Sequence, residues 1–354
     1  MNNHDKLNSI PFFFVIGRAR SGTTLLRCIF DAHPQIIFPL ECAFIIHLYG
    51  KYGKLKFWDE EKITSFYHDV INYPKFNFWI IDKKKLLDRL MDMKGENSYS
   101  GMCKAVYMNF SSFFQKNEIR LLGDKNPSYS LYTKKLMKLY PEARFIHITR
   151  DYRSNIISMI HAGFEAEIYS SLAYRWMFVN RQVEKQKKRF PQKFFTLRYE
   201  DFVSDPETSL KKMCDFLGVG FSNEMLNYRE KLNEMLAVYP KELIYLHHKS
   251  LLNPINADNI DSWKNILTPH QIKIADTVAG TFAEKYGYEK MFKKSNFFFR
   301  IYCLPGMFYG RLLYFFMGLI HDLPLKFQMK IMKLLAKMFK HDWKMFKNNE
   351  AVQE

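Results

Sequence analysis

Residues 12–27 constrain the fold more than any other stretch of the chain. They begin with the apolar run Phe-Phe-Phe-Val-Ile at 12–16, which predicts a buried parallel strand. A short loop bounded by Gly17 and Gly22 follows, and beyond it the apolar spacing predicts a helix. The N–H groups of such a loop and the N-terminus of the helix converge on an anion. This stretch therefore predicts a phosphate-binding site.

One position separates this loop from the loops that bind ATP or GTP. Gly17, Gly22 and Thr24 match the pattern G-x-x-x-x-G-K-[ST]. Thr23, however, stands where that pattern has the lysine that holds the β- and γ-phosphates of a triphosphate. A cation lies inside the loop instead, at Arg20. The loop thus favours another phosphorylated donor, and a glycine turn without a ligand is the alternative.

Composition narrows the class of protein. The 354 residues suffice for one large α/β domain with an appendage, and the hydrophobic content of 47% allows a sizeable core. The formal net charge of +17 favours anionic partners, whether nucleic acid, a membrane surface or an anionic cofactor. The five cysteines form no C-x-x-C pair, which argues against a zinc site or a disulfide framework and fits a reducing compartment. The polar residues 1–9 lack the apolar core of a signal peptide.

Further apolar runs alternate with helical patterns along residues 10–290. We predict strands at 119–125, 143–149 and 193–199, and helices at 129–139, 154–161 and 206–217. This alternation predicts a three-layer α/β/α domain with a mostly parallel central sheet. Residues 42–114 read as helices joined by loops, and their aromatic side chains are candidates for the walls of an acceptor site: Phe76, Phe78, Trp79, Phe113 and Phe114.

The chain changes character over residues 291–354, which we predict to be a helical extension. Residues 297–320 are strongly apolar, but Pro305 is expected to break them, and the uncharged runs between the arginines are too short to span a bilayer. A stripe of lysines follows at alternating steps of three and four: Lys326, Lys330, Lys333, Lys337, Lys340, Lys344 and Lys347. Residues 297–347 are therefore expected either to contact a membrane surface or to pack on the domain as a solvated helix.

Other candidate site residues lie where predicted strands end. Arg150 ends one strand and Ser158 lies about two helical turns on, so both can face one anion. Lys125 ends another strand, and Tyr199 a third. Glu41 has apolar neighbours, and we expect desolvation to make it basic enough to abstract a proton. Taken singly, each has a plainer interpretation as a surface, turn or helix-start residue.

Together these residues resemble the sulfotransferases that use 3′-phosphoadenosine-5′-phosphosulfate (PAPS). Arg-Ser-Gly-Thr-Thr at 20–24 resembles the 5′-phosphosulfate loop of that family, and Ile-Thr-Arg-Asp at 148–151 with Ser158 resembles its 3′-phosphate motif. The chain is most similar to the tyrosylprotein sulfotransferase group, over most of residues 12–288. Further shared motifs are Arg-Tyr-Glu-Asp-Phe at 198–202 and Asp-Phe-Leu-Gly-Val at 215–219.

The resemblance implies a role for each candidate and no metal. Glu41 would be the base, Lys125 a cation at the transition state, and Arg20 a contact of the transferring sulfuryl group. The remaining residues would bind the donor: Ser21, Gly22, Thr23 and Thr24 around the 5′-phosphosulfate, Arg150 and Ser158 at the 3′-phosphate, Tyr199 beside the nucleotide, and Ser262 at a phosphate.

The chain also departs from that family. Phe38 and Gly123 replace two of its cysteines, and we expect none of the N-terminal membrane anchor found in that family. We therefore expect a cytoplasmic enzyme, peripheral at a membrane, that moves a sulfuryl group from PAPS to a hydrophobic alcohol such as a sterol or lipid. The alternatives are sulfation of tyrosine in an acidic peptide, a small-molecule kinase, and a non-catalytic phosphate-binding protein. Nucleic-acid binding is not expected, because no base-reading module is recognised.

Overall fold

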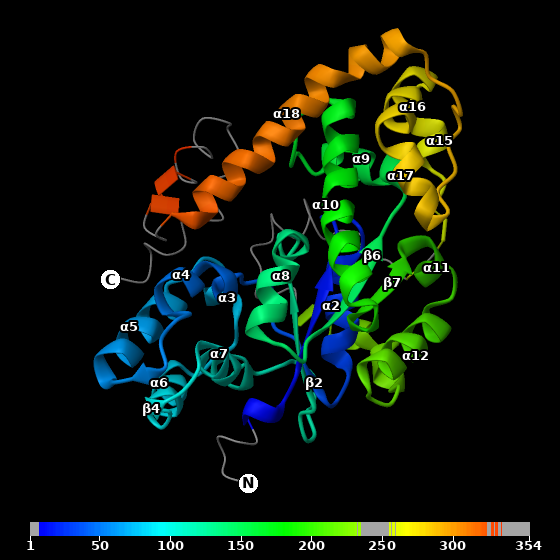
Figure 1. Ribbon diagram of the computed structural model, residues 1–354. Coiled ribbons are helices and arrows are strands. Elements are labelled where there is room, and N and C mark those ends of the chain that lie inside the picture. The colour runs from blue at the N-terminus through cyan, green and yellow to red at the C-terminus, as the bar shows by residue number, and fades with distance from the viewer. Residues whose placement is uncertain are drawn as a thin grey trace.

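The structure is a computed structural model that describes residues 7–231, 233–234, 255, 257–258, 260–323, 327–328, 330–331 and 334. Its centre is a five-stranded sheet in the order β2-β5-β1-β6-β7, in which every neighbouring pair is parallel (Figure 1). The strands are β1 (Phe12–Ile16), β2 (Ile36–Ile37), β5 (Leu121–Lys125), β6 (Arg144–Thr149) and β7 (Phe194–Arg198). The predicted parallel sheet is confirmed.

Both faces of the sheet are covered by helices, as the alternation along β1 shows. Phe12 and Phe14 pack into a core with α7 (Tyr99–Met108) and α8 (Tyr129–Leu139). Phe13 and Val15 point the other way, into a core with α2 (Thr23–Ala32) and α12 (Pro206–Leu217). Successive side chains of a strand face opposite sides, so β1 is buried twice and the three-layer prediction is confirmed.

Helix ends follow the local chemistry that the sequence offers. α12 begins after Asp205, whose carboxylate accepts from the Thr208 N–H, and ends at Gly218. α9 (Tyr152–His161) begins two residues before the predicted start, because Asp151 caps it. α11 (Tyr199–Ser204) begins at Tyr199, directly after β7. The other helical segments between residues 169 and 286 are α10 (Tyr169–Arg189), η2 (Pro191–Lys193), η3 (Asn223–Met225), η4 (Tyr228–Lys231), α15 (Trp263–Ile266), α16 (Pro269–Ala275), η7 (Asp276–Gly280), α17 (Thr281–Ala283) and η8 (Glu284–Tyr286).

Residues 42–114 contain the predicted helices and a small antiparallel sheet that was not predicted. The helices are α3 (Phe44–His47), α4 (Tyr49–Tyr52), α5 (Glu60–Ile71), η1 (Phe76–Phe78), α6 (Lys83–Met91) and α7. The sheet pairs β3 (Phe57–Trp58) with β4 (Gly95–Glu96). Two residues per strand are too few to show an alternating pattern in the sequence.

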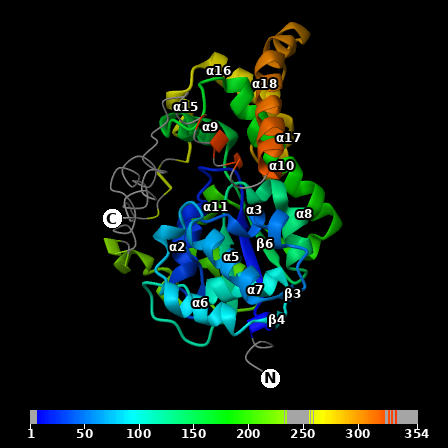
Figure 2. The same ribbon diagram turned by 90° about the vertical axis from the view of Figure 1, so that its left-hand side faces the viewer.

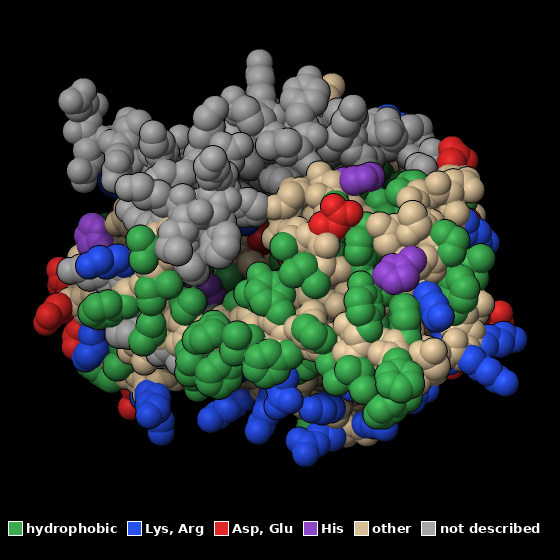
Figure 3. Space-filling view, turned by 90° about the horizontal axis from the view of Figure 1, so that it is seen from above, with side chains coloured by type: hydrophobic (Ala, Val, Ile, Leu, Met, Phe, Trp, Pro, Cys, Tyr) green, Lys and Arg blue, Asp and Glu red, His purple; other side chains and the backbone are tan. Residues whose placement is uncertain are grey.

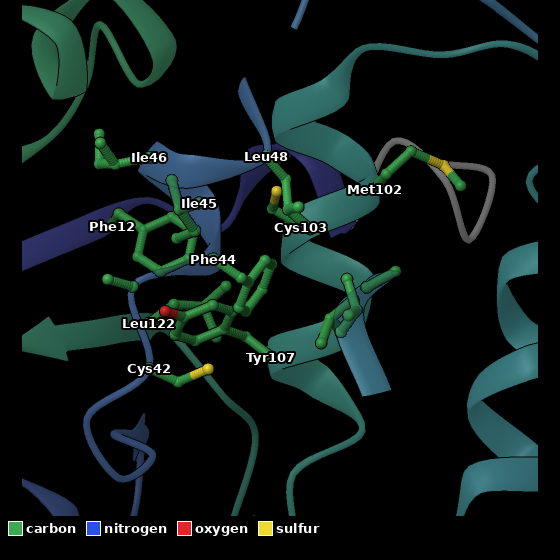
Figure 4. Close-up of a cluster of buried hydrophobic side chains, with 14 of the residues drawn as sticks. Phe12, Cys42, Phe44, Ile45, Ile46, Leu48, Met102, Cys103, Tyr107 and Leu122 are labelled. Atoms are coloured by element: carbon green, nitrogen blue, oxygen red, sulfur yellow. The ribbon is translucent and has the colours of Figure 1, made fainter. Parts of the chain in front are cut away.

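The aromatic residues expected to line an acceptor site belong largely to the core. Phe76, Phe78 and Trp79 are buried, and Trp79 packs against Phe44 and Tyr107. Figure 4 shows part of this cluster, with Cys42 and Phe44 beside Tyr107. Phe113 and Phe114 pack against the core on the other side of the sheet. The acceptor-wall interpretation is therefore wrong for the buried three, which instead support the segment that carries Glu41.

The apolar C-terminal segment is one continuous helix, α18 (Phe297–Asp322), so the predicted break at Pro305 is wrong. Pro305 lies on the exposed side, where it removes a single backbone hydrogen bond. Phe297–Ile320 is long and apolar enough to cross a membrane by length and composition, despite its two arginines. The helix nevertheless lies along α10 in both ribbon views (Figures 1 and 2), and Cys303 and Phe299 pack into the core that α10 lines. The lysine stripe lies outside the described residues, except for the exposed Lys330, and the predicted boundary at 290/291 stays a prediction.

Candidate active site

The loop between β1 and α2 has the conformation that its glycines allow. Gly22 has a φ of 95°, and a Cβ at this position would lie 2.7 Å from the Tyr199 ring. The N–H of Gly17 donates to Ser130 Oγ at 2.9 Å. Arg20 also has a positive φ, of 67°, which is unusual for a residue with a side chain. The loop is therefore held in a fixed shape, and α2 begins at its end with Thr23.

One buried asparagine that sequence reasoning missed braces this loop. Asn155, on α9, donates to the carbonyl of Ala19 at 2.8 Å and to Ser21 Oγ at 3.3 Å. Its Oδ1 accepts from Arg18 Nε at 3.2 Å. Ser21 is fully buried, so its hydroxyl is engaged with the protein here. A polar residue among buried helical positions could have drawn attention to Asn155. The sequence pattern, however, could not show that it bonds to the loop.

The strand order places cations on both sides of the loop. β1 lies between β5 and β6, and all three are parallel. Lys125 ends β5 and Arg150 directly follows β6, so both lie at the carboxyl edge of the sheet beside the loop. Ligands bind at this edge in open α/β sheets.

Glu41 and Lys125 meet next to the loop, as the sequence predicted. Lys125 Nζ lies 2.7 Å from Glu41 Oε2 and donates to Thr24 Oγ1 at 3.2 Å. A second lysine was not predicted: Lys75 Nζ donates to Glu41 Oε1 at 2.8 Å. Lys75 precedes η1 with a φ of 70°. The two oxygens of Glu41 are thus held by two different lysines.

The electrostatics of Glu41 differ from the expectation. Burial disfavours its charged form, as predicted, but Lys125 and Lys75 outweigh burial and hold its pKa well below the ordinary value. The carboxyl group is therefore ionised at neutral pH in this arrangement. The idea that desolvation alone would raise its basicity is wrong, because it left out the charges of Lys125 and Lys75. The carboxylate is 23% exposed, so an acceptor can still reach it.

A second group of predicted residues gathers on the other side of the loop. Arg20 Nε donates to Ser158 Oγ at 3.1 Å, and Arg150 Nη1 donates to the carbonyl of Arg20 at 3.3 Å. The guanidinium of Arg150 lies over the Tyr199 ring, 4.6 Å from its centroid. Burial and the charge of Arg150 lower the pKa of Arg20. The two guanidinium groups and the Ser158 hydroxyl can bind a phosphate, and the Tyr199 ring can stack on a nucleobase beside it.

Arg20 lies with this second group in the structure. The resemblance instead implies that Arg20 contacts the transferring sulfuryl group, which is expected on the other side of the loop, near Glu41 and Lys125. Ser262 directly precedes α15, and the neighbouring Trp263 stacks under the guanidinium of Arg153 at 3.7 Å. The roles of Arg20 and Ser262 stay predictions.

The residues present fit a donor with two anionic ends. The loop, Thr24 and Lys125 would hold the 5′-phosphosulfate, and Arg150 and Ser158 would hold the 3′-phosphate. Among the described residues, no cluster of three or more His, Cys, Asp or Glu could hold a metal ion. Phe38 and Gly123, which replace two cysteines of the similar family, lie side by side. A Cβ on Gly123 would lie 2.5 Å from the Phe38 ring.

The sequence profile of the sulfotransferase family matches residues 11–223, which is more than half of the chain and includes both groups of site residues. The chain belongs to the sulfotransferase family. The resemblance seen in the motifs is therefore confirmed, and so is the enzyme class.

Individual sulfotransferases are distant relatives of the chain. Protein-tyrosine sulfotransferase 2 of Gallus gallus is 23% identical over 265 residues, which cover 72% of this chain and 63% of that protein. The omega-hydroxy-beta-dihydromenaquinone-9 sulfotransferase Stf3 of Mycobacterium bovis is 28% identical over 198 residues, which cover 50% of this chain and 43% of that protein. Among solved structures, the sulfotransferase domain from the curacin biosynthetic pathway superposes with a TM-score of 0.53 at 22% identity, over 79% of this chain and 98% of that domain. This likeness concerns the fold.

Proposed function

We propose that this sulfotransferase transfers the sulfuryl group of PAPS to an acceptor hydroxyl. The observation that supports this most directly is the contact of Lys125 with both Glu41 and Thr24. It joins a carboxylate, a cation and the phosphate-binding loop within one hydrogen-bonded set. A non-catalytic phosphate-binding protein has no need for a base beside its loop.

In the proposed reaction, Glu41 accepts the proton of the acceptor hydroxyl. The acceptor oxygen forms a bond to sulfur while the bond from sulfur to the bridging oxygen breaks, so the products are a sulfate ester and adenosine 3′,5′-bisphosphate (PAP). Negative charge develops on the departing phosphate oxygen, where Lys125 would stabilise it. Without the donor, Lys125 already contacts Glu41. Once the donor is bound, Lys125 would contact both Glu41 and the departing phosphate oxygen.

The kinase alternative is disfavoured by the start of α2. Thr23 holds the position of the triphosphate-binding lysine, and its side chain is buried. The cation at this end of the loop comes from β5, through Lys125.

Two acceptor classes have specific support. The exposed apolar surface of α18 supports a lipid-like alcohol, the class expected from the sequence. The name of the Gallus gallus relative, and the formal net charge of +17 on this chain, support tyrosine in an acidic peptide. We rank the lipid-like alcohol first, because its support is an apolar surface of this chain itself. Tyrosine comes second, because its main support is the name of a relative.

The proposal is tested by incubating the protein with radiolabelled PAPS and a panel of sterols, lipid alcohols, phenols, glycans and acidic tyrosine peptides. We expect label in a lipid-like alcohol with the wild type and a large loss of label with Glu41→Gln. Label in tyrosine peptides alone would select the second acceptor class. Equal transfer by wild type and Glu41→Gln would overturn the assignment of the base.

We also propose that the enzyme works in a reducing compartment, the cytoplasm. The five cysteines are all buried with free thiols in the structure, which supports this location. Activity and melting temperature that do not change with a thiol reductant are expected. Loss of activity on reduction would contradict the location.

A further inference from the structure

Helix α18 has two apolar faces, and the fold uses one of them. Four positions on one side approach α10 or its core: Phe299, Cys303, Gly306 and Gly310. A Cβ on Gly306 would lie 2.0 Å from Ser170 Oγ, and one on Gly310 would lie 2.9 Å from Ser171 Oγ. A side chain at either place would force Ser170 or Ser171 to move, so the two helices pack closely here. This face is therefore fixed to the domain.

The docked face also reaches the donor-binding loop. Arg18 Nη1 donates to the hydroxyl of Tyr314 at 2.9 Å. Glu165 joins Arg18 to Arg175, with distances of 2.8 Å and 2.9 Å. Arg175 in turn lies over the Tyr314 ring, 4.6 Å from its centroid. Since Arg18 directly follows Gly17, the helix is tied to the loop by buried polar contacts as well as by packing.

The opposite face is apolar and exposed. Its residues recur at steps of three and four, roughly half a turn from the docked residues. They are Ile301, Leu304, Phe308, Leu312, Phe315 and Leu319, and their exposed fractions run from 37% to 66%. Seen from above, many apolar side chains lie on this side of the molecule, with lysine and arginine side chains along one edge and acidic and histidine side chains also in view (Figure 3).

The charged residues of α18 and of the segment before it are mostly positive. Residues 291–321 contain no Asp or Glu, and their four cations, Lys293, Lys294, Arg300 and Arg311, are exposed. In a two-fold dimer the same patch would meet itself and bring these cations together. A surface of anionic lipids complements both the apolar stripe and the cations around it.

We infer that α18 seats the protein on an anionic lipid surface, with the stripe from Ile301 to Leu319 entering the interface. The helix lies in the plane of the membrane and does not cross it. A crossing would surround the helix with lipid, whereas one side of α18 is docked on α10 and bonded to Arg18. The inference goes beyond the proposed function, because it concerns where the protein sits and needs no turnover.

The test measures binding of the full-length protein to phosphatidylcholine vesicles with and without phosphatidylserine. Phe308→Ser/Phe315→Ser removes two exposed rings of the stripe. Phe57→Ser/Phe190→Ser is the matched control, because these rings are also exposed but lie on β3 and after α10. Melting temperature and size-exclusion chromatography establish that every variant is folded.

We expect the wild type and the control to bind vesicles that contain phosphatidylserine, and the stripe variant to bind at least about tenfold more weakly. Added salt should weaken the binding of the wild type. Failure of the wild type to bind, or equal binding by the stripe variant, would overturn the inference. So would a wild-type dimer that the stripe substitutions convert to a monomer, since a second copy would then cover the face. None of these outcomes depends on sulfuryl transfer, so they are independent of the proposed reaction.

Discussion

Glu41 is the residue on which the proposed chemistry depends most. Glu41→Gln keeps the size of the side chain and a hydrogen-bonding oxygen, but the amide cannot accept the acceptor proton. We expect kcat to fall by about a hundred- to ten-thousand-fold, the usual contribution of a positioned base. The affinity for PAP, measured by calorimetry, should change little, because the proposed donor contacts lie in the loop and at Arg150. A variant with wild-type kcat would show that another group takes the proton.

Lys75 makes a separate prediction about pH. Its charge helps to hold the pKa of Glu41 low, so Lys75→Gln should raise that pKa. Glu41 must be ionised to act as a base. The acid limb of the profile of kcat/KM against pH should therefore move to higher pH in the variant. Lys51→Gln is a control, since Lys51 pairs with Asp69 on an exposed surface. A lower rate with an unmoved acid limb would mean that Lys75 only supports the fold.

The sequence could predict some of these residues and not others, for a physical reason. Lys125 and Arg150 follow apolar strands, and parallel strands bring their ends to one edge, so their proximity follows from local patterns. Lys75 lies in a turn 34 residues from Glu41, where no periodicity specifies a direction. The expected direction of the Glu41 pKa shift was wrong because the prediction considered burial but neither the charge of Lys125 nor that of Lys75.

At the scale of elements, β5 carries a buried carboxyl group, Asp124, next to Lys125. Burial raises the pKa of Asp124 to about 7, although the Tyr129 hydroxyl donates to it at 2.6 Å. A raised carboxyl pKa means that the folded state holds the proton more tightly than the unfolded chain, whose Asp has a pKa of about 3.9. The stability gained from Asp124 is therefore complete below about pH 4 and is lost as the pH rises toward 7.

Asp124→Asn tests this sign, because the amide stays neutral at every pH. As the pH rises from about 4 to 7, the melting temperature of Asp124→Asn should rise relative to that of the wild type. Asp88→Asn, at an exposed position on α6, should show no such trend. A constant difference for Asp124→Asn would mean that the carboxyl group does not change its proton affinity on folding.

Element prediction succeeded where burial leaves a strong pattern. The parallel strands are continuous apolar runs because helices cover both faces, and Asp205 and Gly218 bound α12 by known capping chemistry. It failed at β3 and β4, which are too short for a pattern. It also failed at Pro305, because packing of α18 along α10 stabilises a helix that local propensity disfavours.

At the scale of the molecule, the proposal joins a donor site at the carboxyl edge of the sheet to a helix that faces lipid. The formal net charge of +17 favours binding of both the anionic donor and an anionic lipid surface. The link between the two parts could not be predicted from the sequence, because the contact between Arg18 and Tyr314 joins residues 296 positions apart.

The most direct test of the central claim is thermal unfolding with PAP or with ATP and magnesium, for the wild type and for Arg150→Ala. PAP at a hundred times its dissociation constant should stabilise the wild type by about 2.7 kcal/mol, and ATP with magnesium should do so weakly. Arg150→Ala should lose most of the PAP effect, because it removes the proposed contact with the 3′-phosphate. A larger stabilisation by ATP with magnesium than by PAP would contradict the account, whatever the variant does.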